Sequence, residues 1–140
     1  MKANELTEGI YVYFNCFDGS KIIVKVTGFK DGVVYGVSED GAHWCQLSQI
    51  EPIPLTPEIL EKNGWKDISD HTLMGSETFR LKYEQNGFDF TITLKLRDYL
   101  KIQSYDDRYY TLYESCCGVK FVHQLQHALR LCRIEKEIEL

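Results

Sequence analysis

Long apolar stretches are missing from this sequence, and proline and glycine are sparse. Three prolines and ten glycines among 140 residues exclude a collagen-like or low-complexity chain. No apolar run approaches the roughly 20 residues of a membrane-spanning helix. The first residues, MKANELTE, lack the apolar core of a secretory signal. We therefore expect a cytoplasmic protein without a membrane partner.

An excess of basic residues is also missing. Sixteen lysines and arginines against twenty-one acidic residues give a formal net charge of −5, which argues against binding nucleic acid through overall charge. The five cysteines contain no C-x-x-C pair, so we expect reduced thiols, with Cys45 and Cys132 as small core residues. Hydrophobic residues make up 44% of the chain, which is enough for a sizeable core.

All three prolines lie between residues 52 and 57, and this segment predicts a boundary between subdomains 1–55 and 56–140. The first subdomain contains short strand-like segments separated by Asp-Gly turns. They cover residues 10–14, 21–29, 33–37, 42–47 and 50–53. Five short strands with tight turns favour a small SH3- or Tudor-like β-barrel, because closure removes exposed sheet edges.

The second subdomain predicts a short helix, an antiparallel meander and a longer helix. Thr56 suits an N-cap, Pro57 the first helical position and Asn63-Gly64 the helix end. Apolar and polar residues alternate over 79–84 and 88–97, which predicts a hairpin with one apolar and one polar face. Two further strands are expected near 99–103 and 109–113. A helix over 119–133 should cover the apolar face of this four-stranded sheet, and the tail 134–140 could add a short strand. The expected fold class is α+β.

Two registers are open around Asn86-Gly87. Asn-Gly chemistry favours a two-residue turn, which places Glu84 opposite Asp89. A four-residue loop over 84–87 places Lys82 opposite Asp89 instead and avoids the like charges. Both registers keep the two faces of the hairpin in phase.

The polar face of the predicted hairpin carries cationic side chains that could hold a phosphate or a carboxylate. They are Arg80, Lys82, Lys95 and Arg97. Tyrosine rings from the segment 105–110 could stack on a base. The further candidate ligand-binding residues are Tyr105, Arg108, Tyr109 and, on the last helix, His127. The alternative interpretation is a solvated sheet face next to an ordinary polar turn.

Metal-dependent catalysis is an alternative function. His123 and His127 are four residues apart and share one face of the predicted helix, where both could reach one metal ion. A third ligand would have to come from elsewhere in the chain, for example from His71, His43 or Asp106. The pair Asp106-Asp107 could share a proton or hold magnesium, but no activated nucleophile is identifiable. We expect no metal and no cofactor, and we favour a protein that is not an enzyme.

Aromatic residues of the first subdomain suggest a different kind of site. Small barrels use such rings to bind peptides or modified side chains, which requires the rings to converge on one point. The candidates are Tyr11, Tyr13, Phe14, Phe17, Tyr35 and Trp44. Core packing is the alternative use for Tyr35 and Trp44.

Three stretches carry a resemblance to a known family: IPLTPEILEKNG from residue 53, VHQLQH from residue 122 and IEKEIEL from residue 134. Over most of its length the chain resembles a family of small uncharacterised proteins of Bacteroidetes genomes, their prophages and their phages. The resemblance implies a phage or mobile-element context and assigns no catalytic or binding residue. By analogy with other small acidic phage proteins, it implies a counter-defence role.

These observations predict a non-enzymatic binding module. Its partner would be a small anionic, nucleotide-like signal that it sequesters, or a host protein that it blocks. A nucleic-acid accessory protein that uses the β-barrel is an alternative, against which the net charge of −5 argues. Exposed tyrosines and the alternating tail are compatible with a homodimer.

Overall fold

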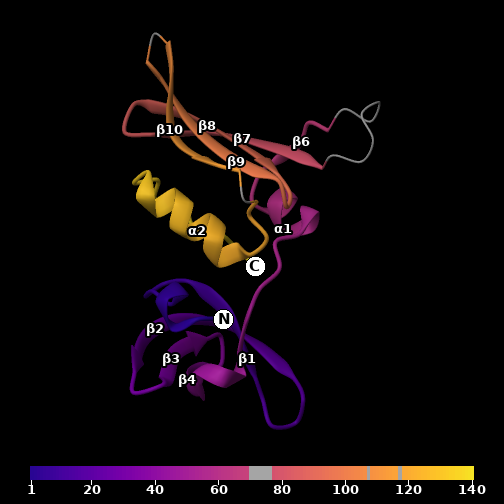
Figure 1. Cartoon of the computed structure of the whole chain (residues 1–140), viewed down its shortest axis with the longest axis vertical. Coiled ribbons are helices and arrows are strands. Elements are labelled where there is room, and N and C mark those ends of the chain that lie inside the picture. The colour runs from indigo at the N-terminus through magenta and orange to yellow at the C-terminus, as the bar shows by residue number, and fades with distance from the viewer. Residues whose placement is uncertain (70–76, 107, 117) are drawn as a thin grey trace. The chain divides into compact units, whose positions relative to one another are not determined.

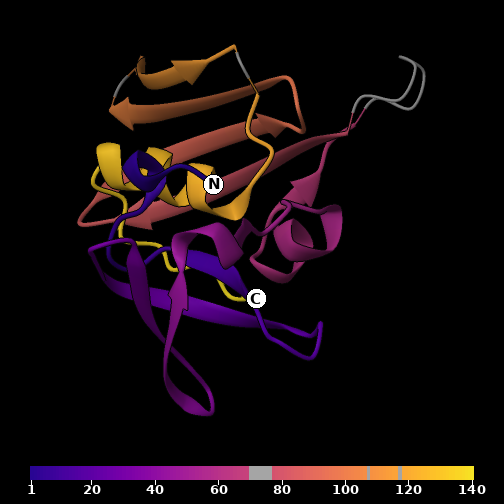
Figure 2. The same ribbon diagram turned by 60° about the horizontal axis from the view of Figure 1, so that its bottom comes forward.

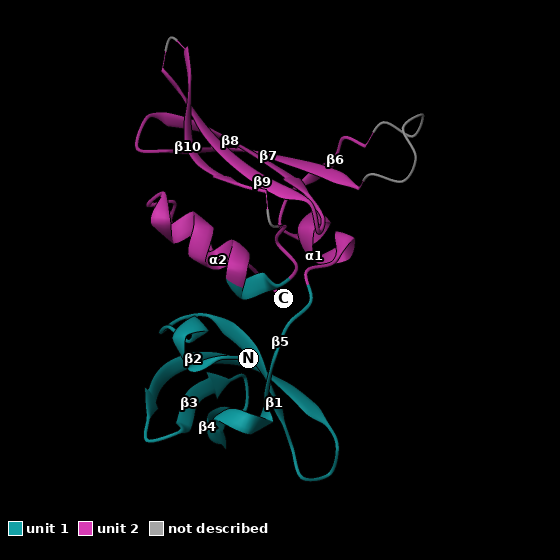
Figure 3. Cartoon of the chain, in the orientation of Figure 1, with its two compact units in different colours: residues 1–54, 121–123 teal, residues 55–120, 124–140 magenta. Residues whose placement is uncertain are grey.

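The structure is a computed structural model of the chain, and it describes residues 1–69, 77–106, 108–116 and 118–140. Within these ranges the fold is α+β, as predicted, with two antiparallel five-stranded sheets and two α-helices (Figure 1). The chain divides into two compact units (Figure 3). Unit 1 comprises Met1–Pro54 and Phe121–His123, and unit 2 comprises Leu55–Lys120 and Gln124–Leu140. The boundary after Pro54 therefore falls inside the proline-containing segment, residues 52–57.

Unit 1 contains a sheet with the strand order β4-β3-β2-β1-β5. The strands agree with the expected ones to within one residue at each end. They are β1 (Tyr11–Asn15), β2 (Lys21–Lys30), β3 (Val33–Ser38), β4 (Gly41–Gln46) and β5 (Ile50–Pro52), with short 3-10 turns η1 (Ala3–Glu5) and η2 (Leu47–Gln49).

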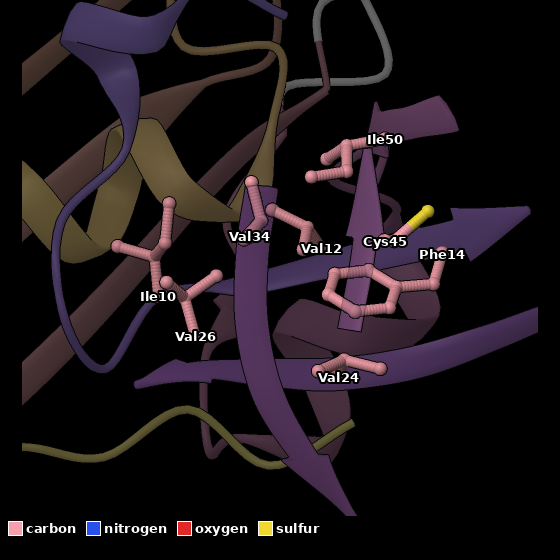
Figure 4. Close-up of a cluster of buried hydrophobic side chains, with 8 residues drawn as sticks. All are labelled: Ile10, Val12, Phe14, Val24, Val26, Val34, Cys45 and Ile50. Atoms are coloured by element: carbon pink, nitrogen blue, oxygen red, sulfur yellow. The ribbon is translucent and has the colours of Figure 1, made fainter. Parts of the chain in front are cut away.

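The expected closure into a barrel is not found among the described residues. The outer strands β4 and β5 each pair with one neighbour only, so the sheet is open. One physical reason lies in β5, which has three residues and ends on Pro52, a residue without an N–H to donate. Alternate side chains of the sheet form a common core, which includes Cys45 as expected (Figure 4). It consists of Ile10, Val12, Phe14, Val24, Val26, Val34, Cys45 and Ile50.

Unit 2 contains a sheet with the strand order β10-β9-β8-β7-β6. Its strands are β6 (Lys66–Asp67), β7 (Thr78–Gln85), β8 (Phe88–Lys95), β9 (Tyr99–Asp106) and β10 (Arg108–Ser115). The predicted four-stranded meander is confirmed, and the two-residue strand β6 extends it. Helix α2 (Val122–Leu131) lies along one face of this sheet (Figures 1 and 2). It buries Leu125, Ala128 and Leu129, and it is shorter at both ends than the expected 119–133.

Helix α1 (Pro57–Lys62) begins and ends where the sequence predicts. The Thr56 hydroxyl accepts a hydrogen bond from the Ile59 N–H at 3.3 Å, and Pro57 occupies the first turn. After the C-cap Asn63, Gly64 has φ 85°, a left-handed conformation that glycine adopts without steric cost.

The turn between β7 and β8 has two residues, which resolves the open register. Asn86 and Gly87 both have positive φ, 53° and 82°, as a type I′ turn requires. Glu84 therefore stands opposite Asp89. Both carboxylates are exposed, so water and salt screen their repulsion and turn chemistry decides the register.

The tail after α2 is not the short strand suggested by its alternating sequence. Ile134 and Ile138 are buried, but the tail backbone is held by side-chain amides instead of a neighbouring strand. Asn63 donates to the Glu139 carbonyl at 2.8 Å and accepts from the Glu139 N–H at 2.7 Å. Gln85 donates to the Arg133 carbonyl and accepts from the Glu135 N–H.

Gly36 on β3 should tolerate no side chain. An added Cβ would overlap Val24 Cγ1 and lie 2.8 Å from the Lys25 carbonyl oxygen. We expect Gly36→Ala to lower the free energy of unfolding by about 1–3 kcal/mol, measured by urea denaturation. Gly28→Ala on β2 is the matched control, since its Cβ would meet nothing within 4 Å. Equal losses in the two variants would contradict this description of the core.

The side-chain amides of Asn63 and Gln85 each clamp the tail through two hydrogen bonds, and these clamps give a second prediction. Asn63→Asp keeps the acceptor for the Glu139 N–H but loses the donor to the carbonyls of Ile59 and Glu139. We expect a loss of about 1–3 kcal/mol, because the two part-buried hydrogen bonds donated by the Asn63 amide are lost and a carboxylate replaces the amide of a buried side chain, and faster hydrogen exchange over 134–140. Gln85→Glu changes the more exposed clamp and should have a smaller effect. Unchanged exchange in Asn63→Asp would show that the amide does not hold the tail.

Candidate functional site

One face of the unit 2 sheet is polar and carries a row of cationic side chains. In the backbone register, Lys66 stands opposite Arg80, Arg80 opposite Thr93, and Thr93 opposite Lys101. Residues directly opposite each other share a face, so this row runs across four strands. Lys82 is the next side chain on the same face of β7, roughly 7 Å further along the strand.

Three of these cations line one hollow. Lys66, Arg80 and Lys82 surround a volume of about 370 Å³ together with Gly64 and Ile68. This volume is within the range of small-molecule sites. Its described lining comes from strands β6 and β7 and from Gly64 and Ile68, which lie just before and just after β6.

No counter-charge neutralises the three cations within the described ranges. The side chains of Lys66, Arg80 and Lys82 make no ion pair there. Asp67, next to Lys66, falls on the opposite face of β6 by strand alternation, and its carboxylate accepts from the Ser69 N–H at 2.8 Å. Glu84 follows Lys82 on the polar face, one step further from the hollow.

The other predicted cations lie outside the hollow. The Lys95 ammonium pairs with Asp98 at 2.9 Å. Arg97 is exposed in the turn between β8 and β9, where its φ is 65°. Arg108 lies on the face opposite to Tyr109, stacks over the Tyr110 ring at 5.1 Å and donates to the Tyr110 hydroxyl at 2.8 Å.

The predicted tyrosines form a separate corner of the polar face. Tyr105 and Tyr109 stand opposite each other with ring centroids 5.0 Å apart. Their row is two steps from that of Arg80, roughly 13 Å along the strands. His127 lies on α2, which packs against the opposite face of the sheet. The structure thus brings Arg80 and Lys82 together and keeps the tyrosine pair and His127 apart from them.

Lys66 and Lys101 also belong to this face, although the sequence pattern did not identify them. Lys66 lies in a two-residue strand, which is too short to give an alternating pattern. Lys101 has a clear pattern in β9, but its cross-strand position depends on the β8–β9 register. Only the pairing of strands shows that both side chains share a face with Arg80.

The residues of the metal hypothesis do not form a cluster in the part of the chain that the structure describes. No group of three His, Cys, Asp or Glu side chains there could hold a metal ion. His123 is buried, stacks on Phe121 and has its Nε2 3.9 Å from a Glu5 carboxylate oxygen. His43 shares a hydrogen bond with the Ser38 hydroxyl at 2.7 Å. His71 and Asp107 lie outside the described residues.

A second hollow, of about 400 Å³, lies in unit 1. Its lining residues come from β1, the β1–β2 turn, β2, β4 and η2. They are Phe14, Asn15, Cys16, Phe17, Ile22, His43, Trp44, Cys45, Gln46 and Gln49. Of the predicted aromatics, Phe14 is buried, whereas Phe17 and Trp44 are exposed. Tyr35 is 45% exposed beside Trp44 on the neighbouring strand, so neither of these two rings packs in the core.

Comparison of the chain with protein-family models, with curated proteins and with solved structures found no match. Among the described residues, neither α-helix has the length and apolar character needed to cross a membrane.

The two thiols of the unit 1 hollow should differ in reactivity. Burial raises the pKa of Cys45, so little of its thiolate is present at pH 8, whereas Cys16 is only half-buried. We expect iodoacetamide to label Cys16 at least about tenfold faster than Cys45, measured by peptide mass spectrometry. Equal labelling rates in the folded protein would contradict this placement of Cys45 in the core.

Proposed function

We propose that the chain is a non-enzymatic binding module whose unit 2 hollow takes the phosphate of a small anionic, nucleotide-like ligand. The observation that carries the proposal is the convergence of Lys66, Arg80 and Lys82 on one hollow, without a described counter-charge. Adjacent like charges repel, and a bound anion relieves that repulsion. Arg80 adds a planar guanidinium that can hold two phosphate oxygens at once.

The surroundings of the hollow suit a ligand with more than one polar group. Lys101 and the threonines of β8, Thr91 and Thr93, continue the polar face beyond Arg80 and Lys82. A diphosphate or triphosphate could reach from the hollow toward Lys101. Tyr105 and Tyr109 stand one row further along the strands than Lys82 and do not line the hollow.

The alternative of a nucleic-acid accessory protein has less support in unit 1. Lys21 and Lys25 lie over the rings of Tyr13 and Tyr11, and Lys21 also pairs with Glu51. These lysines and tyrosines are therefore engaged with one another instead of forming an open cationic and aromatic surface.

Further proposals concern the fold of unit 1 and the context of the protein. We propose that unit 1 is an opened variant of an SH3- or Tudor-like barrel, supported by the position of β1 between β2 and β5. The resemblance supports phage or prophage origin and a counter-defence role, by sequestering the ligand or blocking a host protein. Cytoplasmic location and homodimer formation remain parts of this proposal.

Replacing two of the three cations of the hollow should weaken ligand binding. The double variant Arg80→Gln/Lys82→Gln should weaken binding of ATP or inorganic triphosphate at least tenfold, measured by isothermal titration calorimetry, because two phosphate contacts are removed. Lys120→Gln changes an exposed lysine that does not line the hollow and should bind as the unaltered protein does. Mass spectrometry of the purified protein would identify a co-purifying nucleotide. Equal affinities of the two variants would refute the proposed site.

A further inference from the structure

Strand β4 leaves one side of its backbone free. It is an outer strand of the unit 1 sheet and pairs only with β3. Within the described ranges, residues 42–46 make no main-chain hydrogen bond outside that pairing. Every second residue of an edge strand directs its N–H and C=O away from its partner. These groups are ready to pair with another extended chain.

The apolar hollow of unit 1 lies beside this strand. Residues 43–46 of β4 line it on one side, and Phe14, Phe17 and Ile22 line it on the other. Strands β1 and β2 are not neighbours of β4 in the sheet, so the hollow spans a gap that backbone pairing does not fill. Its lining ranges from the buried Phe14 to Phe17 and Trp44, which are 102% and 69% exposed.

The charge around β4 is negative. No lysine or arginine lines the hollow, and the exposed Glu39 and Asp40 form the turn that leads into β4. Asp18 follows Phe17, and hydrogen bonds from the Ser20 hydroxyl and N–H lower its pKa, so it is ionised at neutral pH. Residues 1–54 as a whole contain four lysines against seven acidic residues.

We infer that β4 and the adjoining hollow bind an extended basic peptide of another protein by adding it as a strand. The peptide pairs with the free edge of β4 through main-chain hydrogen bonds, and one apolar side chain enters the hollow between Phe17 and Trp44. Its lysines or arginines lie near Glu39 and Asp40. This occupant accounts for the free edge, the exposed rings and the local charge together, and it is independent of the anion site in unit 2.

The test uses three synthetic octapeptides and a ¹⁵N-labelled full-length protein. The first peptide alternates Thr and Lys around a central Phe; the second has Glu for each Lys; the third has Ser for Phe. We expect saturable amide shifts at 42–46 and at Cys16 and Phe17 with the first peptide. The other two peptides should bind at least tenfold more weakly, because each lacks one of the two recognised features.

Matched variants locate the site. Phe17→Ala removes a fully exposed ring and should weaken binding of the first peptide at least fivefold. The double variant Glu39→Gln/Asp40→Asn should weaken it to the same extent. Phe88→Ala removes an exposed ring of unit 2 and should leave binding unchanged. Equal binding of all three peptides, or shifts outside β4 and the hollow, would overturn the inference. Concentration-dependent shifts at 42–46 without peptide would overturn it in favour of a second copy of the chain. Phe17→Ala should bind ATP as the unaltered protein does. Its loss of peptide binding can therefore be distinguished from a failure of the anion site in unit 2.

Discussion

Antiparallel pairing of β6, β7, β8 and β9 is the constraint on which the proposed function depends. Strand alternation sends Phe79, Leu81 and Ile92 into the core, so the intervening side chains must face the other way. The registers then align Lys66, Arg80 and Lys101 across the sheet. The cationic face is thus a direct consequence of burying the apolar face. A shift of one residue in the register of any strand would move that strand's polar side chains to the apolar face.

The two units offer surfaces of opposite chemistry. Within the described residues, unit 2 presents cations without an ion pair over a polar sheet, whereas unit 1 presents exposed aromatic rings and an unpaired strand edge in an acidic setting. An overall charge of −5 conceals this difference. If both proposals hold, the proposed anion site and the inferred peptide site would suit a protein that links a small signal to a protein partner.

Local patterns were sufficient to predict most of the secondary structure. The cap at Thr56, the Asn86-Gly87 turn and the alternation in β7 and β8 depend on neighbouring residues, and the sequence contains them. What could not be predicted depends on pairing between distant segments. The open edge of unit 1, the side-chain clamps on the tail and the membership of Lys66 in the cationic row all arise from long-range register. For the site, sequence identified Arg80 and Lys82 but could not separate them from Arg97 or Tyr105.

The most direct measurement is an NMR titration of the intact protein with inorganic pyrophosphate, followed at the side-chain nitrogens of lysine and arginine. We expect saturable shifts at Lys66, Arg80 and Lys82, with much smaller changes at the paired Lys95 and at Lys120, which does not line the hollow. Weak, unsaturable shifts of similar size at every lysine and arginine would contradict it, since they would show a diffuse ion atmosphere instead of a site.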